Sequence, residues 1–145
     1  MKENNVTFII VDRGGKEINR VIDNFKQTFE SYFSGVYFII VEQDDDLPFK
    51  RGQLYNIGVR YVDTEWIGLI DNDIINIEQF NPIEKYEELG GPFIAFDKIV
   101  QCKVQNEKIE QIEEPKLRPY GFGAFNFMKT EDFKNVNGFS NLCIG

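Results

Sequence analysis

The residues best suited to chemistry are two carboxylates one position apart, in the triplet Asp71-Asn72-Asp73. They directly follow residues 66–70, an apolar run typical of a buried strand. Mg²⁺ and Mn²⁺ prefer hard oxygen ligands and keep positions open for phosphate oxygens. Such a pair could therefore hold a cation that binds a diphosphate and stabilises it as a leaving group. Taken alone, the triplet is equally compatible with a solvated loop at a strand end.

The segments that must position this triplet alternate between strand and helix. Residues 6–11, 36–41 and 66–70 are continuous apolar runs, which predict strands buried on both faces. Between them, residues 16–33 and 50–62 carry apolar side chains at helical spacing. This alternation predicts an open α/β sheet, in which ligands bind at the carboxyl ends of the strands. In the second helix, we expect the buried face to carry Leu54, Ile57 and Tyr61.

The second half of the chain has shorter elements. Asn81-Pro82 predicts the cap and first residue of a short helix that stops near residues 90–91. Thr130 is expected to cap a last short helix, which ends at Asn137-Gly138. The remaining segments are strand-like, with a hairpin arm in the middle: 93–96, 99–104, 108–112 and 121–128.

Two further polar segments have more than one interpretation. Asp44-Asp45-Asp46 could bind a cation, but it lacks the glycine and terminal glutamate of an EF-hand loop, so a solvated loop is favoured. Gly14-Gly15 follows the first strand and could cradle phosphate. Because the G-x-G-x-x-G spacing is absent, a plain turn is favoured.

Composition narrows the class of protein. The 145 residues contain no internal repeat or linker, so residues 1–145 are expected to form a single domain. A net charge of -8 argues against a nucleic-acid partner, and the lack of histidine excludes histidine-dependent triads and histidine metal ligands. No segment is long enough to span a membrane. With only two cysteines, we expect a reducing, cytoplasmic setting.

The order of several motifs resembles the β-1,4-galactosyltransferase family, glycosyltransferase family seven. Residues 49–58, Phe-Lys-Arg-Gly-Gln-Leu-Tyr-Asn-Ile-Gly, resemble that family's Phe-Asn-Arg-Ala-Lys-Leu-Leu-Asn-Val-Gly, and an Asp-x-Asp follows at a similar distance. Residues 94–98 resemble its Val-Ala-Met-Asp-Lys, and residues 121–124 with 137–139 resemble its Phe-Gly-Gly-Val…Asn-Gly-Phe stretch. The resemblance covers nearly the whole chain. It implies a GT-A fold, an open mixed sheet flanked by helices, and a UDP-sugar donor, with UDP-galactose as one candidate.

The resemblance also implies roles for individual residues. It places Phe49 and Arg51 at the nucleotide, and Arg13 against the uridine, although the family's Arg-x-Arg spacing is absent. Lys98 matches a lysine that approaches the diphosphate. In the triplet, Asp73 matches the direct ligand of Mn²⁺ or Mg²⁺, and Asp71 matches the first acid.

The chain also departs from the family. There, Asn-Gly-Phe precedes a Trp-Gly-rich segment whose paired acids supply the base for the saccharide acceptor, and a later histidine completes the metal site. This sequence reaches Gly145 where that segment would begin, so we expect a C-terminally shortened GT-A domain with an unidentified catalytic base. Two alternatives are a non-catalytic remnant that binds a nucleotide or a partner protein, and a processive-type glycosyltransferase of another family with the same fold.

Overall fold

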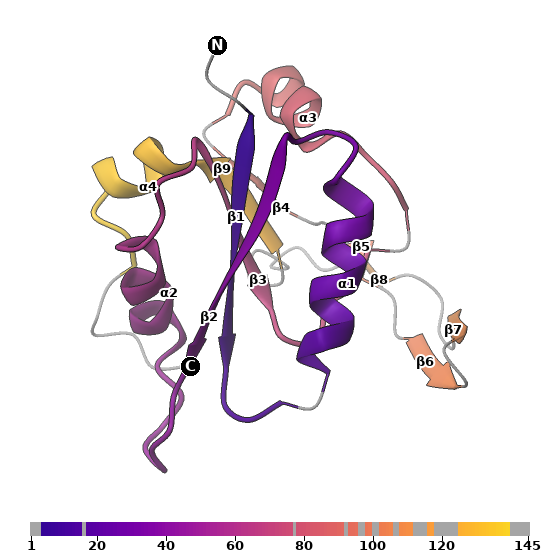
Figure 1. Cartoon of the computed structure of the whole chain (residues 1–145), viewed down its shortest axis with the longest axis vertical. Coiled ribbons are helices and arrows are strands. Elements are labelled where there is room, and N and C mark those ends of the chain that lie inside the picture. Colours follow the sequence, from indigo (N-terminus) through magenta and orange to yellow (C-terminus); the bar gives the residue numbers. More distant parts are fainter. Residues whose placement is uncertain are drawn as a thin grey trace.

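The computed structural model describes residues 4–15, 17–76, 78–91, 93–95, 98–99, 102–105, 108–111, 116–117 and 125–139. Its centre is a five-stranded mixed sheet of strand order β2-β1-β3-β9-β4 (Figure 1). Three strands are parallel: β1 (Asn5–Asp12), β2 (Gly35–Glu42) and β3 (Trp66–Asp71). Strand β9 (Phe125–Lys129) runs antiparallel to β3 and to β4 (Phe93–Ala95). The predicted open mixed sheet is therefore confirmed.

The register of the parallel strands brings their carboxyl ends to one edge of the sheet. Val11 pairs with Asp71, and Asp12 pairs with Glu42. The arrowheads of β1 and β2 point toward this edge at the bottom of Figure 1. As a result, the polar residues that follow β1, β2 and β3 gather in one place, as expected for a ligand-binding edge.

Helices cover both faces of the sheet. Helices α1 (Ile18–Phe29) and α3 (Pro82–Leu89) pack on one face, whereas α2 (Arg51–Val59) and α4 (Thr130–Asn135) pack on the other. The alternation of side chains along β1 explains this arrangement, because successive residues of a strand point to opposite faces. Phe8 and Ile10 belong to the core with α1, while Ile9 and Val11 belong to the core with α2.

Aromatic side chains fill the core beneath α1. The ring centroid of Phe8 lies 5.2 Å from that of Phe25, in an edge-to-face arrangement. Phe8 also lies over Gly68 of β3, where a Cβ atom would collide with the phenyl ring. Trp66 stacks on Phe127 with centroids 5.0 Å apart, which confirms its predicted place in the core. This packing fixes the position of β3, the strand that carries the acidic triplet.

Two expectations about buried surfaces were wrong. Strand β2 is an edge strand, not a strand buried on both faces, so Tyr37 and Ile40 are 53% and 47% exposed. In α2, Ile57 is 42% exposed, and Tyr61, two residues beyond the end of the helix, is 76% exposed. The face of the helix that packs on the sheet instead carries Leu54, Tyr55, Gly58 and Val59. Gly58 permits this close approach, because a Cβ there would lie 2.8 Å from Ile9 Cγ2.

The ends of the short helices were predicted in part. Asn81 caps α3 by accepting hydrogen bonds from the backbone N–H groups of Ile83 and Glu84, and Gly90 ends it with a left-handed φ of 72°. Both features were expected. Thr130, however, is the first residue of α4 and not its cap; the capping position belongs to Lys129, which makes no side-chain capping hydrogen bond.

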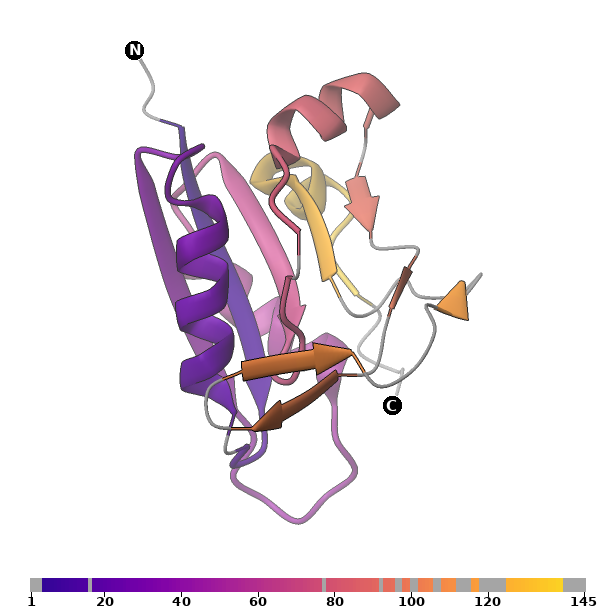
Figure 2. The same ribbon diagram turned by 90° about the vertical axis from the view of Figure 1, so that its right-hand side faces the viewer.

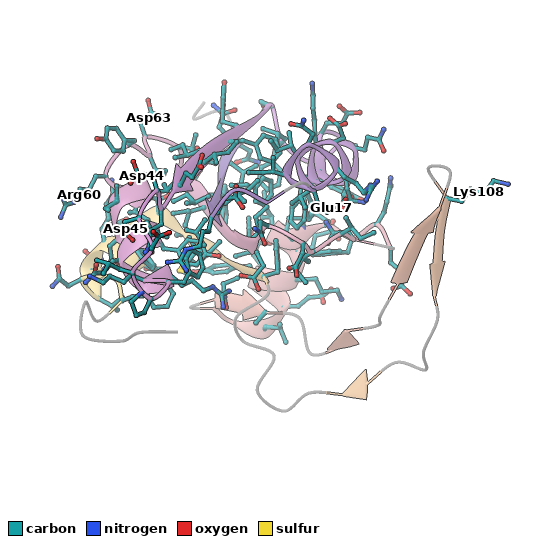
Figure 3. All side chains as sticks on the ribbon, turned by 90° about the horizontal axis from the view of Figure 1, so that it is seen from below. Glu17, Asp44, Asp45, Arg60, Asp63 and Lys108 are labelled. Carbon is teal, nitrogen blue, oxygen red and sulfur yellow. The ribbon has the colours of Figure 1, made fainter. Side chains whose placement is uncertain are left out.

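The segment between β4 and β9 forms small antiparallel pairs. Strand β5 (Lys98–Ile99) pairs with β8 (Lys116–Leu117), and β6 (Cys102–Gln105) pairs with β7 (Lys108–Gln111), as the expected hairpin. The β6–β7 hairpin stands apart from the main sheet, beyond α1 in Figure 1, and Figure 3 shows Lys108 near its tip. Figure 2 shows its two antiparallel strands from the side. Of the predicted strand over 121–128, residues 125–128 lie in β9 and residues 121–124 lie outside the described residues. None of the described helices has the length and apolar character needed to cross a membrane.

Candidate functional site

The candidate site lies at the carboxyl edge of the sheet, around the end of β3. Alternation along β3 continues into the triplet: Ile67 and Leu69 face α2, and Asp71 follows them at the same spacing. Asp71 is accordingly found against the start of α2. Asn72 and Asp73 form the turn that follows the strand.

Helix α2 holds the end of β3 through two side chains. The Arg51 guanidinium forms an ion pair with Asp71, with 2.5 Å between Nη2 and Oδ1. One turn later, the Tyr55 hydroxyl donates a hydrogen bond of 2.9 Å to the carbonyl oxygen of Ile70. The guanidinium also lies 5.6 Å from the centroid of the Tyr55 ring. These contacts fix the first acid of the triplet relative to the helix.

Asp71 is an electrostatically unusual carboxylate. Burial raises its pKa, the charge and hydrogen bond of Arg51 lower it, and the charge of Asp73 raises it again, for a resulting pKa of about 6. The side chains of Arg51 and Asp71 are 29% and 28% exposed, so solvent screens the pair only in part. Asp71 therefore carries its negative charge at neutral pH with limited compensation, and additional positive charge nearby would stabilise it.

Asp12, at the end of β1, lies on the other side of the triplet. It is only 4% exposed, and its carboxylate accepts hydrogen bonds from the Asn72 amide at 2.6 Å and from the Gly15 backbone N–H at 2.9 Å. Burial opposes its ionisation, but the hydrogen bonds from the Asn72 side chain and from the backbone of Gly15, Arg13 and Gly14 together outweigh burial, and the pKa of Asp12 is lowered. Asp12 was not among the predicted site residues. A glycine three residues later and an asparagine inside the triplet were the available signals.

Arg13, which was expected against the uridine, and Phe49, which was expected at the nucleotide, contact each other. The guanidinium of Arg13 lies 5.6 Å from the centroid of the Phe49 ring and donates a hydrogen bond to the carbonyl oxygen of Leu47. Arg13 and Gly14 also line a pocket of about 310 Å³, together with Glu42 at the end of β2 and residues 43–46 that follow it. The first strand and the loop before α2 thus form one continuous surface.

Gln43 organises the loop that forms this pocket. Its side-chain amide donates to the Asp45 carboxylate at 2.6 Å and to the Leu47 carbonyl at 3.1 Å, and its Oε1 atom accepts from the Lys50 backbone N–H at 3.0 Å. Asp45 also accepts from the Leu47 backbone N–H. Asp45 therefore has a structural role inside the loop. Figure 3, seen from this end of the sheet, labels Asp44 and Asp45 on the loop.

The remaining predicted site residues are placed less fully. Asp73 is exposed on the turn after β3. Lys98 lies in β5, where it pairs with Leu117, and its side chain lies outside the described residues. The structure thus brings together Asp71 with Arg51 and Arg13 with Phe49, and it leaves the prediction for Lys98 untested.

The donor atoms at the triplet fit a divalent cation that also binds a ligand. Asp71 and Asp73 offer hard carboxylate oxygens, and the pKa of Asp71 is raised by burial and by the charge of Asp73, which Arg51 offsets only in part. Within the ranges that the structure describes, no cluster of three or more aspartate, glutamate, cysteine or histidine side chains could hold a metal ion. A cation here would consequently need oxygens from a bound ligand, as Mg²⁺ and Mn²⁺ often do at phosphate sites.

Comparison with known proteins identifies the fold. No family model and no curated protein matches the sequence. Among solved structures, the chain is similar to Drosophila β-1,4-galactosyltransferase 7. A mutant of that enzyme in complex with manganese, UDP-Gal and xylobiose gives a TM-score of 0.62 at 16% identity, covering 98% of this chain and 56% of that chain. The catalytic domain in complex with xylobiose gives 0.64 at 14% identity, with the same coverage.

A bacterial protein extends the comparison. A structure assigned as a glucose-1-phosphate thymidylyltransferase from Bacillus anthracis, in complex with sucrose, gives a TM-score of 0.50 at 14% identity. It covers 91% of this chain and 74% of that chain. At such identities, similarity establishes the fold, and function must be argued from the site. The chain spans just over half the length of the galactosyltransferase structures that it matches, and it shares their GT-A fold.

Proposed function

We propose that this domain binds a UDP-sugar together with Mn²⁺ or Mg²⁺ and that it serves glycosyl transfer to a saccharide acceptor. The observation that carries the proposal is the Arg51–Asp71 ion pair at the carboxyl end of β3, with Asp73 exposed two residues later. A guanidinium beside a pair of carboxylates suits a diphosphate and its metal ion, since each charge on the ligand has an opposite charge near it. UDP-galactose is the candidate donor, by similarity to the family described above.

Each proposed residue has a separate part in donor binding. Asp73 would bind the cation directly, and Asp71 would bind it directly or through water. Arg51 would pair with a phosphate oxygen, while Arg13 and Phe49 would contact the base and ribose, beside the pocket that follows β2. A bound cation would supply Lewis-acid stabilisation of the diphosphate leaving group.

Titration of UDP tests the donor site. Isothermal titration calorimetry should show stronger binding of UDP in Mn²⁺ than in EDTA, and Asp73→Ala should remove that difference. Asp63→Ala is the matched control, because Asp63 is an exposed aspartate that precedes β3, at the opposite end of the strand (Figure 3). Equal UDP affinity with and without Mn²⁺, or equal affinity in wild type and Asp73→Ala, would contradict the proposal.

A second candidate function is nucleotide binding without transfer. Two observations favour it: Asp12 is buried, and Asp71 is paired with Arg51, so neither carboxylate is available as a base for an acceptor hydroxyl. Release of UDP from UDP-galactose, with and without saccharide acceptors, separates the two functions. Acceptor-dependent release supports transfer, whereas tight binding of UDP without any release supports the second candidate.

A further inference from the structure

Asp12, Gly15 and Asn72 form a small interlocked cluster that the proposed donor site does not use directly. The last paired residues of β1 and β3 are Val11 and Asp71, so the Asp12–Asn72 hydrogen bond of 2.6 Å is a link just beyond the ladder. Gly15 closes the cluster from the side. A Cβ atom on Gly15 would lie 2.7 Å from Asp12 Oδ1 and 2.8 Å from Asn72 Nδ2, so only glycine fits without a shift.

The hydrogen bonds of Asp12 argue against direct metal binding by this residue. Its Oδ1 atom accepts from both the Asn72 amide and the Gly15 backbone N–H, and its Oδ2 atom lies 3.1 Å from the same Gly15 nitrogen. With a side chain that is 4% exposed, Asp12 has little access to a ligand. Its carboxylate is therefore suited to hold another group in place.

The group that Asp12 holds is the middle residue of the acidic triplet. Asp71 is fixed by Arg51 of α2, and Asn72 is fixed by Asp12 of β1, so the turn is attached on both sides while Asp73 stays exposed. Without the second attachment, the peptide that leads from Asn72 to Asp73 could rotate. The two carboxylates would then keep no constant separation.

We propose that Asp12 and Asn72 are a positioning pair that fixes the turn from Asp71 to Asp73 in the form that binds a divalent cation. The proposal rests on the proposed function, because it assumes that a cation bridges these acids and a diphosphate. It adds that the middle residue of the triplet has a role of its own, which is to donate a hydrogen bond to Asp12 of β1. Neither Asp12 nor Asn72 needs to touch the cation.

The test uses UDP affinity in Mn²⁺ and in EDTA for Asn72→Ala, Asp12→Ala and the double variant. Because each single substitution removes a hydrogen bond to a charged carboxylate, each variant should bind UDP roughly tenfold more weakly in Mn²⁺, equivalent to about 1.4 kcal/mol. Affinity in EDTA should not change. The double variant should also bind UDP only about tenfold more weakly in Mn²⁺, since either substitution alone already breaks the pair.

The control is Asp132→Ala, which removes a hydrogen bond of 2.9 Å from the Tyr86 hydroxyl. Asp132 lies in α4, which follows the end of β9 that pairs with Trp66, at the opposite end of β3. It should leave the ratio of the two affinities unchanged. If Asp12→Ala fails to show a cooperative thermal transition, Asn72→Ala alone decides, because its side chain is only half-buried.

Three results would overturn the proposal. If the ratio of UDP affinity in Mn²⁺ to that in EDTA were the same in the single variants as in wild type, the pair would not position the turn. If the double variant bound UDP roughly a hundredfold more weakly in Mn²⁺, the two residues would act independently. Both results leave the proposed function intact, since wild type still requires Mn²⁺. Wild type without Mn²⁺-dependent binding would overturn the proposed function and the positioning role together.

Discussion

Replacing Arg51 with glutamine should raise the pKa of Asp71 and shift the pH dependence of folding. Burial and the charge of Asp73 would still disfavour the ionised carboxyl, but the guanidinium at 2.5 Å would be gone. Breaking a fully buried ion pair costs about 3–5 kcal/mol and an exposed pair contributes about 0–1 kcal/mol. Because both side chains are nearly 30% exposed, we expect loss of the Arg51–Asp71 pair to cost about 2 kcal/mol, which would raise the pKa of Asp71 by about 1.5 units.

The sign of the pH effect follows from the proton bound in the folded state. Asp71 has a pKa of about 6 in the folded protein against 3.8 when unfolded, so the folded state holds the proton longer. Its contribution to the free energy of unfolding is therefore greatest below the unfolded pKa and is lost as pH rises through 6. In Arg51→Gln, that loss should continue up to a pH of about 7–8, given the shift of about 1.5 units.

Urea denaturation at pH 5 and pH 8 measures this difference. At pH 5 Asp71 is mostly protonated in both proteins, and their midpoints should lie close together, apart from lost packing on Tyr55. At pH 8 the midpoint of Arg51→Gln should be clearly lower. Arg60→Gln is the matched control, because Arg60 is an exposed arginine at the other end of α2 (Figure 3).

A difference between the urea midpoints of wild type and Arg51→Gln that is the same at pH 5 and at pH 8 would refute the reasoning. It would mean that Arg51 stabilises the fold by packing alone and that its charge does not hold the Asp71 carboxyl ionised. Carbon-13 NMR of the aspartate carboxyls gives an independent measurement. An unchanged pKa of Asp71 in Arg51→Gln would refute the electrostatic account even if the variant were less stable.

Three further predictions concern the same edge of the sheet. Lowering the pH from 7 to 5 should weaken Mn²⁺-dependent UDP binding, because protons compete for Asp71 at its pKa of about 6; binding in EDTA should change much less in calorimetry. Gly15→Ala places a methyl group between Asp12 and Asn72, so its free energy of unfolding in urea should fall by about 1–3 kcal/mol. Phe49→Ala should weaken UDP binding to a similar extent in Mn²⁺ and in EDTA, since the ring is proposed to contact the nucleoside and not the cation.

Local patterns predicted most of the architecture. Apolar runs of strand length and helical spacing located β1, β3, α1 and α2, because those patterns depend on which faces are buried. The cap at Asn81-Pro82 and the glycines at 90–91 located α3. Strand order depends on long-range pairing that no local pattern contains. Residues 36–41 are as apolar as a central strand, yet β2 lies at the edge of the sheet, and its outer side chains are exposed.

The candidate site was predicted in its residue types but not in its contacts. The acidic triplet, Arg13, Phe49 and Arg51 were identified from sequence, and the structure places them at one edge of the sheet. The Arg51–Asp71 pair joins residues on different elements, and its formation depends on how α2 crosses β3. Asp12 was missed as a site residue because an aspartate at a strand end is common in loops, and only its burial against Asn72 distinguishes it.

Alternation along the strands explains why neighbouring residues of the triplet have different partners. Ile67 and Leu69 face α2, so Asp71, two residues further, meets Arg51 on that face. Trp66 and Ile70 of β3 face α1, and Asn72 follows them at the same spacing. On β1, Phe8 and Ile10 face α1, and Asp12 follows them at the same spacing. The pairing of Asp12 with Asn72 therefore follows from the parity of the two strands and from their parallel register. In this chain the middle residue of an Asp-x-Asp motif bonds back to the scaffold, while Asp71 pairs with Arg51 and Asp73 stays exposed.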